Sequence, residues 1–297
     1  MENENIKEYE KAGRIAAMVR EHARTLVKPG ATLLSVAKTL EDMIIKEGCG
    51  IAFPVNISIN NNAAHYTPSF DDKLTFSEND VVKVDVGTHV EGCIGDTAIT
   101  IDLSGKNAKL LEASEQALEA AIATVKAGIS TADIGAAIEK EITSRNFKPI
   151  INLCGHVLAP YVVHSGFSIP NVETQSGFEL EEGLVIAIEP FATTGTGMVR
   201  ESTRTEIFSQ EKMIKTRNPH ARKLQDFVND YKGMPFAERW LYEKMPELQL
   251  KLALRELAAN EAFRSYPVLH DIDGSLVSQH EHSVLVEKDG CKLLTKR

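Results

Sequence analysis

The stretch of this sequence that most restricts the fold is VVKVDVGTHVEGCIGDTAIT, residues 81–100, which carries one aspartate in each half. Its apolar residues recur at every second position in both halves, which is the period of a β-strand. Glycines at positions 87, 92 and 95 punctuate the two runs. The stretch therefore predicts two antiparallel strands joined as a hairpin.

The two aspartates of this hairpin raise an electrostatic problem. A turn centred near Val90 and Glu91 would place Asp85 directly opposite Asp96, where paired side chains lie roughly 4.5 to 5.5 Å apart. Two carboxylates at that separation repel each other, so either the pKa of one is strongly raised or a cation lies between them. A metal ion would resolve the repulsion. The alternative is that one aspartate faces solvent at the edge of a loop.

The periodicity of the remaining chain predicts helices that alternate with strands. Apolar residues at steps of three or four predict four helices, within residues 6–19, 33–44, 107–128 and 130–146. Strand patterns occupy residues 50–60 and 183–191, and two closing strands are expected around a turn at Asp289 and Gly290. Strands that belong to one core but are interrupted by helices are typical of the α+β class.

Residues 209–263 differ in character from their surroundings. They are rich in helical patterns punctuated by Pro219, Pro235 and Pro246, so we expect a helical insertion within the α+β core. Residues 211–256 carry ten lysines or arginines against seven aspartates or glutamates, whereas the whole chain has a net charge of −9. A small helical DNA-binding module is one interpretation of this local excess, but charges of mixed sign along helices more often mark a solvated face.

Composition restricts the classes of protein that remain. A chain of 297 residues with 43% hydrophobic and 25% charged residues is typical of a globular protein. The charged amino-terminal sequence lacks the apolar core of a signal peptide, and no apolar run reaches the length of a membrane span, so we expect a cytoplasmic protein. The four cysteines form no CxxC pair, which argues against a zinc finger or a redox motif. The negative charge disfavours nucleic acid as a partner.

Three further segments place an acid or an imidazole where a strand pattern meets a turn: INLCGHVLAP with His156, LVIAIEPF with Glu189 and VSQHEHSVLV with Glu281. Each alone is compatible with a structural role. Together with the two aspartates they make four carboxylates and one imidazole on apolar runs, and burying four such acids without cations would be prohibitive. Oxygen-rich ligation with one nitrogen suits Mn, Fe, Co or Zn, and bridging carboxylates can hold two ions about 3.5 to 4 Å apart.

The order Asp, Asp, His, Glu, Glu, with an eleven-residue step between the aspartates, resembles the methionine aminopeptidases and their relatives with the pita-bread fold. CGIAFPVNISINNNAAHYTP resembles the segment that leads into the site of the type II enzymes, and GHVLAPYVVHSG is similar to the region that holds a metal-ligating and a substrate-contacting histidine. Residues 209–263 resemble the helical insertion that separates type II from type I. The short amino terminus is similar to archaeal members. The resemblance implies one catalytic pita-bread domain over residues 1–297.

The resemblance also implies an activity and a site. The activity is removal of the initiator methionine from nascent proteins, by attack of a hydroxide that bridges two divalent ions (Co, Mn, Fe or Zn) on the first peptide bond. The implied metal ligands are Asp85, Asp96, His156, Glu189 and Glu281. Glu189 is also the implied proton shuttle, while His164 and His65 contact and orient the substrate. The implied walls of the methionine pocket are Phe53, Val163, Phe191 and Tyr266.

The implied partners are amino-terminal methionyl peptides, and the expected state is a monomer, with contact to the ribosome left open. His280 departs from the family pattern, since many relatives carry phenylalanine there. His280 and His282 lie two residues apart, on the strand face opposite to Glu281, so we expect both outside the ligand set.

Two other functions are compatible with the same fold. An X-Pro aminopeptidase or prolidase would use the same ligand types, although the segment around His65 and the helical insertion favour the methionine enzyme. A pita-bread protein that binds RNA or ribosomes without metals would be expected to lack some ligands, whereas all five are present in this sequence.

Overall fold

The structure is a computed structural model that describes residues 5–296. The helices are α1 (Ile6–Leu26), α2 (Leu33–Lys46), α3 (Ala108–Thr124), α4 (Thr131–Ser144), α5 (Pro219–Val228) and α6 (Glu247–Ala259). The strands are β1 (Gly50–Ile59), β2 (Asn62–Ala64), β3 (Val81–Val90), β4 (Cys93–Asp102), β5 (Lys148–Pro149), β6 (Cys154–Ala159), β7 (Val162–Pro170), β8 (Val185–Ile188), β9 (Phe191–Thr193), β10 (Arg200–Gln210), β11 (Phe236–Ala237), β12 (Phe263–His270), β13 (Val277–Gln279), β14 (His282–Glu287) and β15 (Gly290–Leu293). The four predicted helices are confirmed as α1 to α4.

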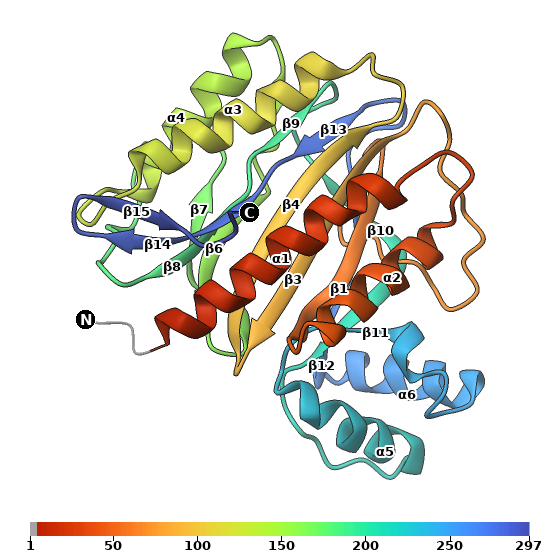
Figure 1. Ribbon diagram of the computed structural model, residues 1–297. Helices are drawn as coiled ribbons and strands as arrows, with labels where there is room; N and C mark the ends of the chain where they lie inside the picture. Colours follow the sequence, from red (N-terminus) through yellow and green to blue (C-terminus); the bar gives the residue numbers. More distant parts are fainter. Residues whose placement is uncertain (1–4, 297) are drawn as a thin grey trace.

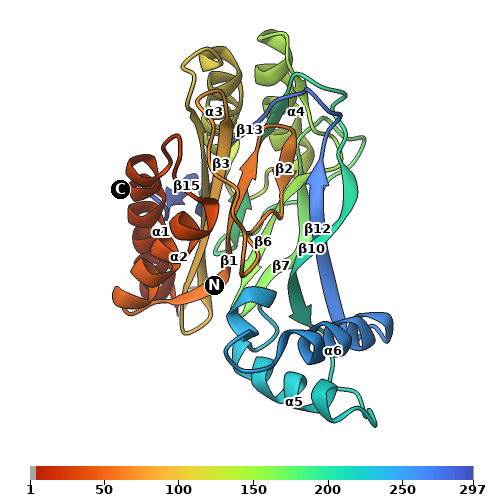
Figure 2. The same cartoon turned by 90° about the vertical axis from the view of Figure 1, so that its right-hand side faces the viewer.

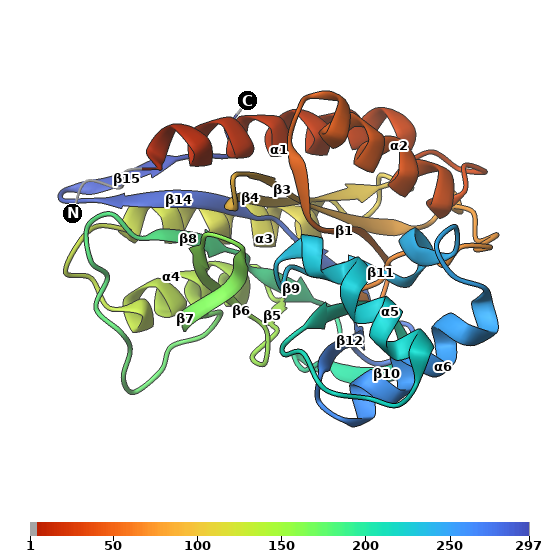
Figure 3. The same cartoon turned by 90° about the horizontal axis from the view of Figure 1, so that it is seen from below.

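The first part of the chain forms one face of the molecule. Strands β1, β3 and β4 form an antiparallel sheet in that order, and α1 and α2 cover one side of it (Figures 1 and 3). The apolar stripes of both helices, which include Val19, Leu40 and Ile44, form one buried cluster with the valines of β3 and with Val55 and Ile57 of β1. This packing leaves the other side of the sheet, which carries the aspartates, to face the rest of the protein.

The predicted hairpin is confirmed, but the predicted register is wrong. Asp85 lies opposite Ala98, and Asp96 lies opposite Gly87. The turn consists of Glu91 and Gly92, with φ values of 48° and 88°, as two-residue hairpin turns with two left-handed residues require. A β-branched valine adopts positive φ poorly, so the turn lies one residue later than a turn centred near Val90 and Glu91. The residue opposite Asp85 is thus two positions further along β4 than predicted. Because side chains alternate between the two faces of a strand, a shift of two positions keeps both aspartates on the same face.

The second half of the core is built from two further sheets. Strands β15, β14, β8, β6 and β7 form one sheet in that order, and β13, β9 and β5 form another. Helices α3 and α4 pack side by side against them (Figure 1). A capping box between Ser130 and Asp133 begins α4.

Two local predictions in this half need correction. The strand expected over residues 183–191 is divided, since β8 ends at Ile188 and β9 begins at Phe191. Pro190 has no N–H to donate to a ladder, so the chain breaks there and leaves Glu189 at the end of a strand. The closing turn consists of Lys288 and Asp289, because Gly290 already pairs with Glu287 as the first residue of β15.

The helix-rich stretch predicted over residues 209–263 contains α5, α6, two short 3₁₀ helices and β11. It leaves from the end of β10 and returns at the start of β12, where Gln210 pairs with Phe263. The helices lie together at one end of these strands (Figure 2). No helix within residues 5–296 is long and apolar enough to cross a membrane.

Candidate active site

One cavity of about 280 Å³ collects the residues that the sequence singled out. Every predicted metal ligand, substrate-contacting histidine and pocket wall lines it: Phe53, His65, Asp85, Asp96, His156, Val163, His164, Glu189, Phe191, Tyr266 and Glu281. These residues span more than two hundred positions of the chain. The fold therefore brings together a site that no single segment contains.

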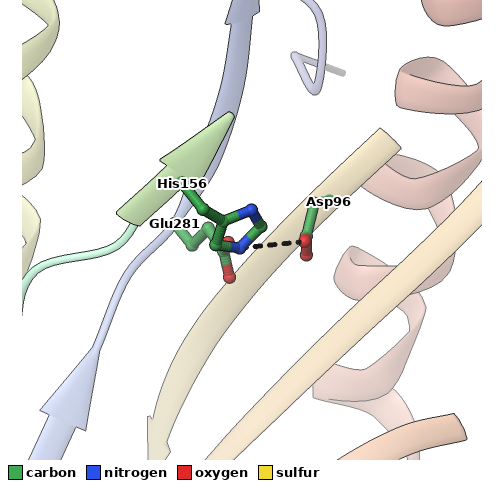
Figure 4. A group of neighbouring side chains, drawn as sticks. All are labelled: Asp96, His156 and Glu281. Carbon is green, nitrogen blue, oxygen red and sulfur yellow. Dashed lines mark ion pairs between the residues drawn. The ribbon is translucent and has the colours of Figure 1, made fainter. Parts of the chain in front are cut away.

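The acids and the imidazole reach the cavity from strands of two sheets and from the segments that follow β8 and β13. Asp85 and Asp96 project from the hairpin of β3 and β4, His156 projects from β6, and Glu189 follows the last residue of β8. Glu281 lies just before β14, in the two-residue link that joins it to β13. Figure 4 shows Asp96, His156 and Glu281 pointing toward one another from these separate elements.

The distances describe a compact group of potential ligands. Each of Asp96, His156 and Glu281 offers one ligand atom, and these atoms all lie within 4.8 Å of one another. Nε2 of His156 is 3.8 Å from Oδ2 of Asp96 and 3.5 Å from Oε1 of Glu189. The Nε2 group of Gln279 donates to Oε2 of Glu189 at 3.4 Å and to Oε2 of Glu281 at 3.3 Å. One amide thus orients two of the carboxyl groups.

Desolvation and mutual repulsion perturb the four acids. Burial raises the pKa of Asp85 to about 7. Burial, with repulsion from neighbouring acids, raises the pKa values of Asp96, Glu189 and Glu281 well above the usual range. Burial lowers the pKa of His156 to about 4, so its imidazole is neutral near pH 7. A neutral imidazole cannot neutralise the acids but can serve as a metal ligand.

The unsatisfied atoms of the group fit a metal ion. Oδ1 of Asp85, Oδ1 of Asp96 and Nδ1 of His156 are buried without a hydrogen-bond partner. Buried polar atoms of this kind are rare in folded proteins, and each calls for a partner such as an ion. Four carboxyl groups with one imidazole form an oxygen-rich donor set of the kind that Mn, Fe, Co and Zn accept. The residues therefore fit the divalent ions that the sequence predicted.

Two histidines and a tyrosine form the wall beside these acids. The ring of His164 lies 4.4 Å from that of His156, and the ring of Tyr266 lies 5.6 Å from that of His65. His65 has a φ of 64°, a left-handed conformation that is uncommon for non-glycine residues. Its Nδ1 lies 3.2 Å from the carbonyl oxygen of Pro267, which can only accept, so Nδ1 carries the proton and Nε2 is left as an acceptor.

Both wall histidines are neutral near pH 7. Burial lowers the pKa of His65 to about 4. Desolvation by the surrounding protein lowers the pKa of His164, and the neighbouring His156 lowers it further. Both side chains can therefore donate or accept hydrogen bonds without adding positive charge.

The cavity also contains residues that the sequence analysis missed. Cys154 and Arg264 line it, and the Arg264 guanidinium lies 5.2 Å from the centre of the Tyr266 ring. Cys154 precedes His156 by two residues, and Arg264 precedes Tyr266 by two, both within strands. Residues two apart in a strand share a face, so this periodicity could have indicated both.

His280 and His282 point away from the cavity, as expected. Nδ1 of His280 lies 2.8 Å from Oγ of Ser114, and Nδ1 of His282 lies 2.8 Å from Oγ1 of Thr295. Their rings therefore belong to the opposite side of the segment that carries Glu281.

The fold and this group of buried acids define a metallopeptidase. The model of metallopeptidase family M24 matches residues 7–214, and the chain belongs to that family. It is 47% identical over 287 residues to a methionine aminopeptidase of Pyrococcus abyssi, covering 96% of this chain and 97% of that protein. It is 46% identical over 297 residues to a methionine aminopeptidase of Archaeoglobus fulgidus, covering 100% of both.

The crystal structure of a methionine aminopeptidase from Thermotoga maritima superposes with a TM-score of 0.73 at 23% identity, covering 99% of this chain and 97% of that chain. The predicted α+β pita-bread fold is thereby confirmed. Within family M24, the chain falls among the methionine aminopeptidases.

Proposed function

We propose that this chain is a metal-dependent aminopeptidase that removes the initiator methionine from nascent proteins. The observation that carries the proposal is the single cavity in which buried acids and an imidazole meet an apolar wall. Near-full-length relatives named methionine aminopeptidase support the same function. Because the substrate is a newly made chain, we expect the protein to act in the cytoplasm. A monomeric state and contact with the ribosome stay predictions.

We assign ion binding to the residues whose atoms meet in the cavity. The ligands in this assignment are Asp85, Asp96, His156, Glu189 and Glu281, and together they would hold two divalent ions, with Co, Mn, Fe and Zn as candidates. When bound, such ions lower the pKa of a coordinated water to about 7 and polarise the scissile carbonyl group.

Glu189 is the proposed proton carrier. It lies at the end of β8, where Pro190 stops the strand, and its Oε2 accepts a hydrogen bond from Gln279. A raised pKa suits a carboxyl group that takes a proton from water and gives it to the departing amine near neutral pH. Asp85 would accept a hydrogen bond from the free amino group of the substrate.

The neutral histidines are proposed to orient the first peptide bond. His164 would donate to the carbonyl oxygen as negative charge develops there. His65, whose Nδ1 donates to the Pro267 carbonyl, presents Nε2 as an acceptor for a peptide N–H. Replacing either histidine should lower turnover while the ions stay bound.

The proposed methionine pocket is the apolar wall of the cavity. Phe53, Val163, Phe191 and Tyr266 are all buried, and the Tyr266 hydroxyl lies 3.2 Å from Oγ of Ser209. An apolar and partly aromatic wall suits a thioether, which is polarisable and packs well against rings.

We further propose that the chain is one catalytic domain of the archaeal type II kind, with residues 209–263 as its helical insertion. The family model stops at residue 214, within four residues of the end of β10. The inserted helices close on their own apolar cluster, which includes Leu224, Leu250 and Leu257. The two relatives described above come from Pyrococcus and Archaeoglobus.

The decisive experiment is hydrolysis of Met-Ala-Ser by the purified, manganese-loaded protein, compared with a peptide that has proline in the second position. We expect cleavage of the first peptide, and preference for the second would favour the X-Pro aminopeptidase. Glu189→Gln should lower kcat by about 10²- to 10⁴-fold, the usual contribution of a general acid or base. Glu287→Gln, at an exposed position of β14, is the matched control and should keep full activity. A protein that retains no metal after incubation with manganese and cleaves neither peptide would support the RNA- or ribosome-binding alternative.

A further inference from the structure

Asp96 and Glu281 contribute to one group of ligands although they belong to different sheets. Strand β4 is an edge of the β1-β3-β4 sheet, whereas β13 and β14, on either side of Glu281, belong to two different sheets, β13-β9-β5 and β15-β14-β8-β6-β7. The separation of the two carboxyl groups therefore depends on how residues 96–100 join residues 279–283. We call this contact the seam.

Within the seam, backbone hydrogen bonds join only one pair of residues, Ala98 and Glu281. The N–H of Glu281 donates to the carbonyl oxygen of Ala98 at 3.0 Å, and the N–H of Ala98 approaches the carbonyl oxygen of Glu281 at 3.4 Å. The second contact is at the long end of the range for a hydrogen bond. The ladder by itself would hold the segment of Glu281 loosely.

Side-chain hydroxyl groups replace backbone groups at the neighbouring steps. Oγ of Ser283 accepts from the N–H of Asp96 at 2.9 Å and donates to its carbonyl oxygen at 2.8 Å. Oγ1 of Thr100 does the same with Gln279, at 2.8 and 2.7 Å. Each step of two residues along β4 thus matches a step of two in the opposite direction along residues 279–283, as in an antiparallel ladder.

Thr97 supplies the short bond at the central step. Its Oγ1 accepts from Nη1 of Arg20 at 2.6 Å and donates to the carbonyl oxygen of Glu281 at 2.7 Å. A guanidinium group has no acceptor, so Arg20 must donate, and the single hydroxyl proton of Thr97 is directed to Glu281. Thr97 is fully buried, and the Arg20 side chain is 8% exposed.

We propose that Thr97, oriented by Arg20, is a positioning residue that fixes the carboxyl group of Glu281 relative to that of Asp96 for ion binding. The inference rests on the proposed metal-dependent function. Loss of the hydroxyl would leave the carbonyl oxygen of Glu281 with only the long contact from Ala98. Mutation of a residue that orients a metal ligand typically lowers metal affinity by about 10- to 100-fold.

The test is cobalt binding by Thr97→Val and Thr97→Ser, measured by calorimetry on metal-free protein together with the visible spectrum of the bound cobalt. We expect Thr97→Val to bind about tenfold more weakly, with altered absorption bands, and Thr97→Ser to bind within about twofold of the unaltered protein. Arg20→Met keeps the hydroxyl but removes the group that orients it. Its affinity should fall between those of the unaltered protein and Thr97→Val.

Thr88 provides the matched control. It is a fully buried threonine of the same sheet, and its Oγ1 donates to the carbonyl oxygen of Ala12 at 2.7 Å, away from the seam. Thr88→Val loses this one hydrogen bond, whereas Thr97→Val loses the bond to Glu281 and also the bond from Arg20. Urea unfolding of the metal-free proteins should therefore show destabilisation in both variants, and more in Thr97→Val. Of these two threonine variants, only Thr97→Val should lose cobalt affinity.

The outcomes separate this inference from the proposed function. Equal cobalt affinity in Thr97→Val and the unaltered protein, or equal loss in Thr88→Val, would overturn the role of Thr97. If the unaltered protein binds cobalt without cleaving methionyl peptides, the proposed function fails while the binding comparison still decides the role of Thr97. If the unaltered protein binds no divalent ion, both proposals are wrong.

Discussion

The buried ion pair between Arg239 and Glu41 offers a quantitative test of how the helical stretch is joined to the core. The Arg239 side chain is 3% exposed and that of Glu41 is 8% exposed. Glu41 also accepts hydrogen bonds from the indole of Trp240 at 3.0 Å and from the N–H of Val55 at 3.2 Å. The perturbation that we consider is Arg239→Met, which keeps most of the apolar stem and removes the charge.

We expect this change to lower the free energy of unfolding by about 3 to 5 kcal/mol at pH 8, the usual cost of leaving one member of a buried pair without its partner. Replacement of both members, in Glu41→Gln with Arg239→Met, should recover most of that loss, because no unpaired charge remains. Lys251→Met removes an exposed ion pair with Glu247 in α6 and should change stability by about 0.5 kcal/mol or less.

The loss should also depend on pH, with a definite sign. Burial already raises the pKa of Glu41, and Arg239 opposes that rise, so Arg239→Met raises the pKa further. When folding raises the pKa of a carboxyl group, the free energy of unfolding is highest at pH values below the pKa of that group in the unfolded chain, about 4.3. It then falls by about 1.4 kcal/mol per pH unit until the pH passes the folded pKa. The deficit of Arg239→Met should therefore be largest at pH 8 and should shrink toward pH 5.

The assay is urea unfolding of the metal-loaded variants at pH 5, 6, 7 and 8, with KM for a methionyl peptide as a second measurement. Arg239 donates to Oγ1 of Thr67 at 2.6 Å, and Thr67 donates to the carbonyl oxygen of Val55 at 2.8 Å. Val55 and Thr67 lie two residues from Phe53 and His65, so KM should rise as well. A deficit below about 1 kcal/mol, or one that is equal at pH 5 and pH 8, would refute the reasoning.

Three further predictions concern the ions, the pocket and a helix start. Chelated protein should melt at a lower temperature than manganese-loaded protein and should cleave no methionyl peptide, since an ion at a hundredfold excess over Kd adds about 2.7 kcal/mol of stability; equal melting curves in calorimetry would contradict this. Gly87→Ala should raise KM for methionyl peptides about tenfold with little change in kcat. The reason is that a Cβ at position 87 would lie 2.2 Å from a ring carbon of Phe53 and would push the ring into the cavity. Unchanged steady-state kinetics would count against Phe53 as a pocket wall. Ser130→Ala, which removes the capping box of α4, should cost about 1 kcal/mol in urea unfolding and leave kcat/KM unchanged; loss of activity would show that α4 affects the site.

Local pattern in the sequence was enough for most of the elements. The helices α1 to α4 follow from apolar stripes, and the β3–β4 hairpin follows from alternation around glycines, because both patterns are set by near neighbours in the chain. The candidate ligands could also be named, since acids on apolar runs are costly to bury without a cation. The order of those ligands and the surrounding segments then indicated the family, which the near-full-length relatives confirm.

The tertiary structure decided what depends on distant neighbours. The hairpin register followed from which two residues could adopt positive φ at the turn, and that moved Asp96 from opposite Asp85 to opposite Gly87. The convergence of Asp96, His156 and Glu281 depends on the packing of three sheets, so no local spacing could give its distances. The seam of hydroxyl groups was invisible in the sequence for the same reason, because the partners of these hydroxyl groups lie 179 to 187 residues away along the chain.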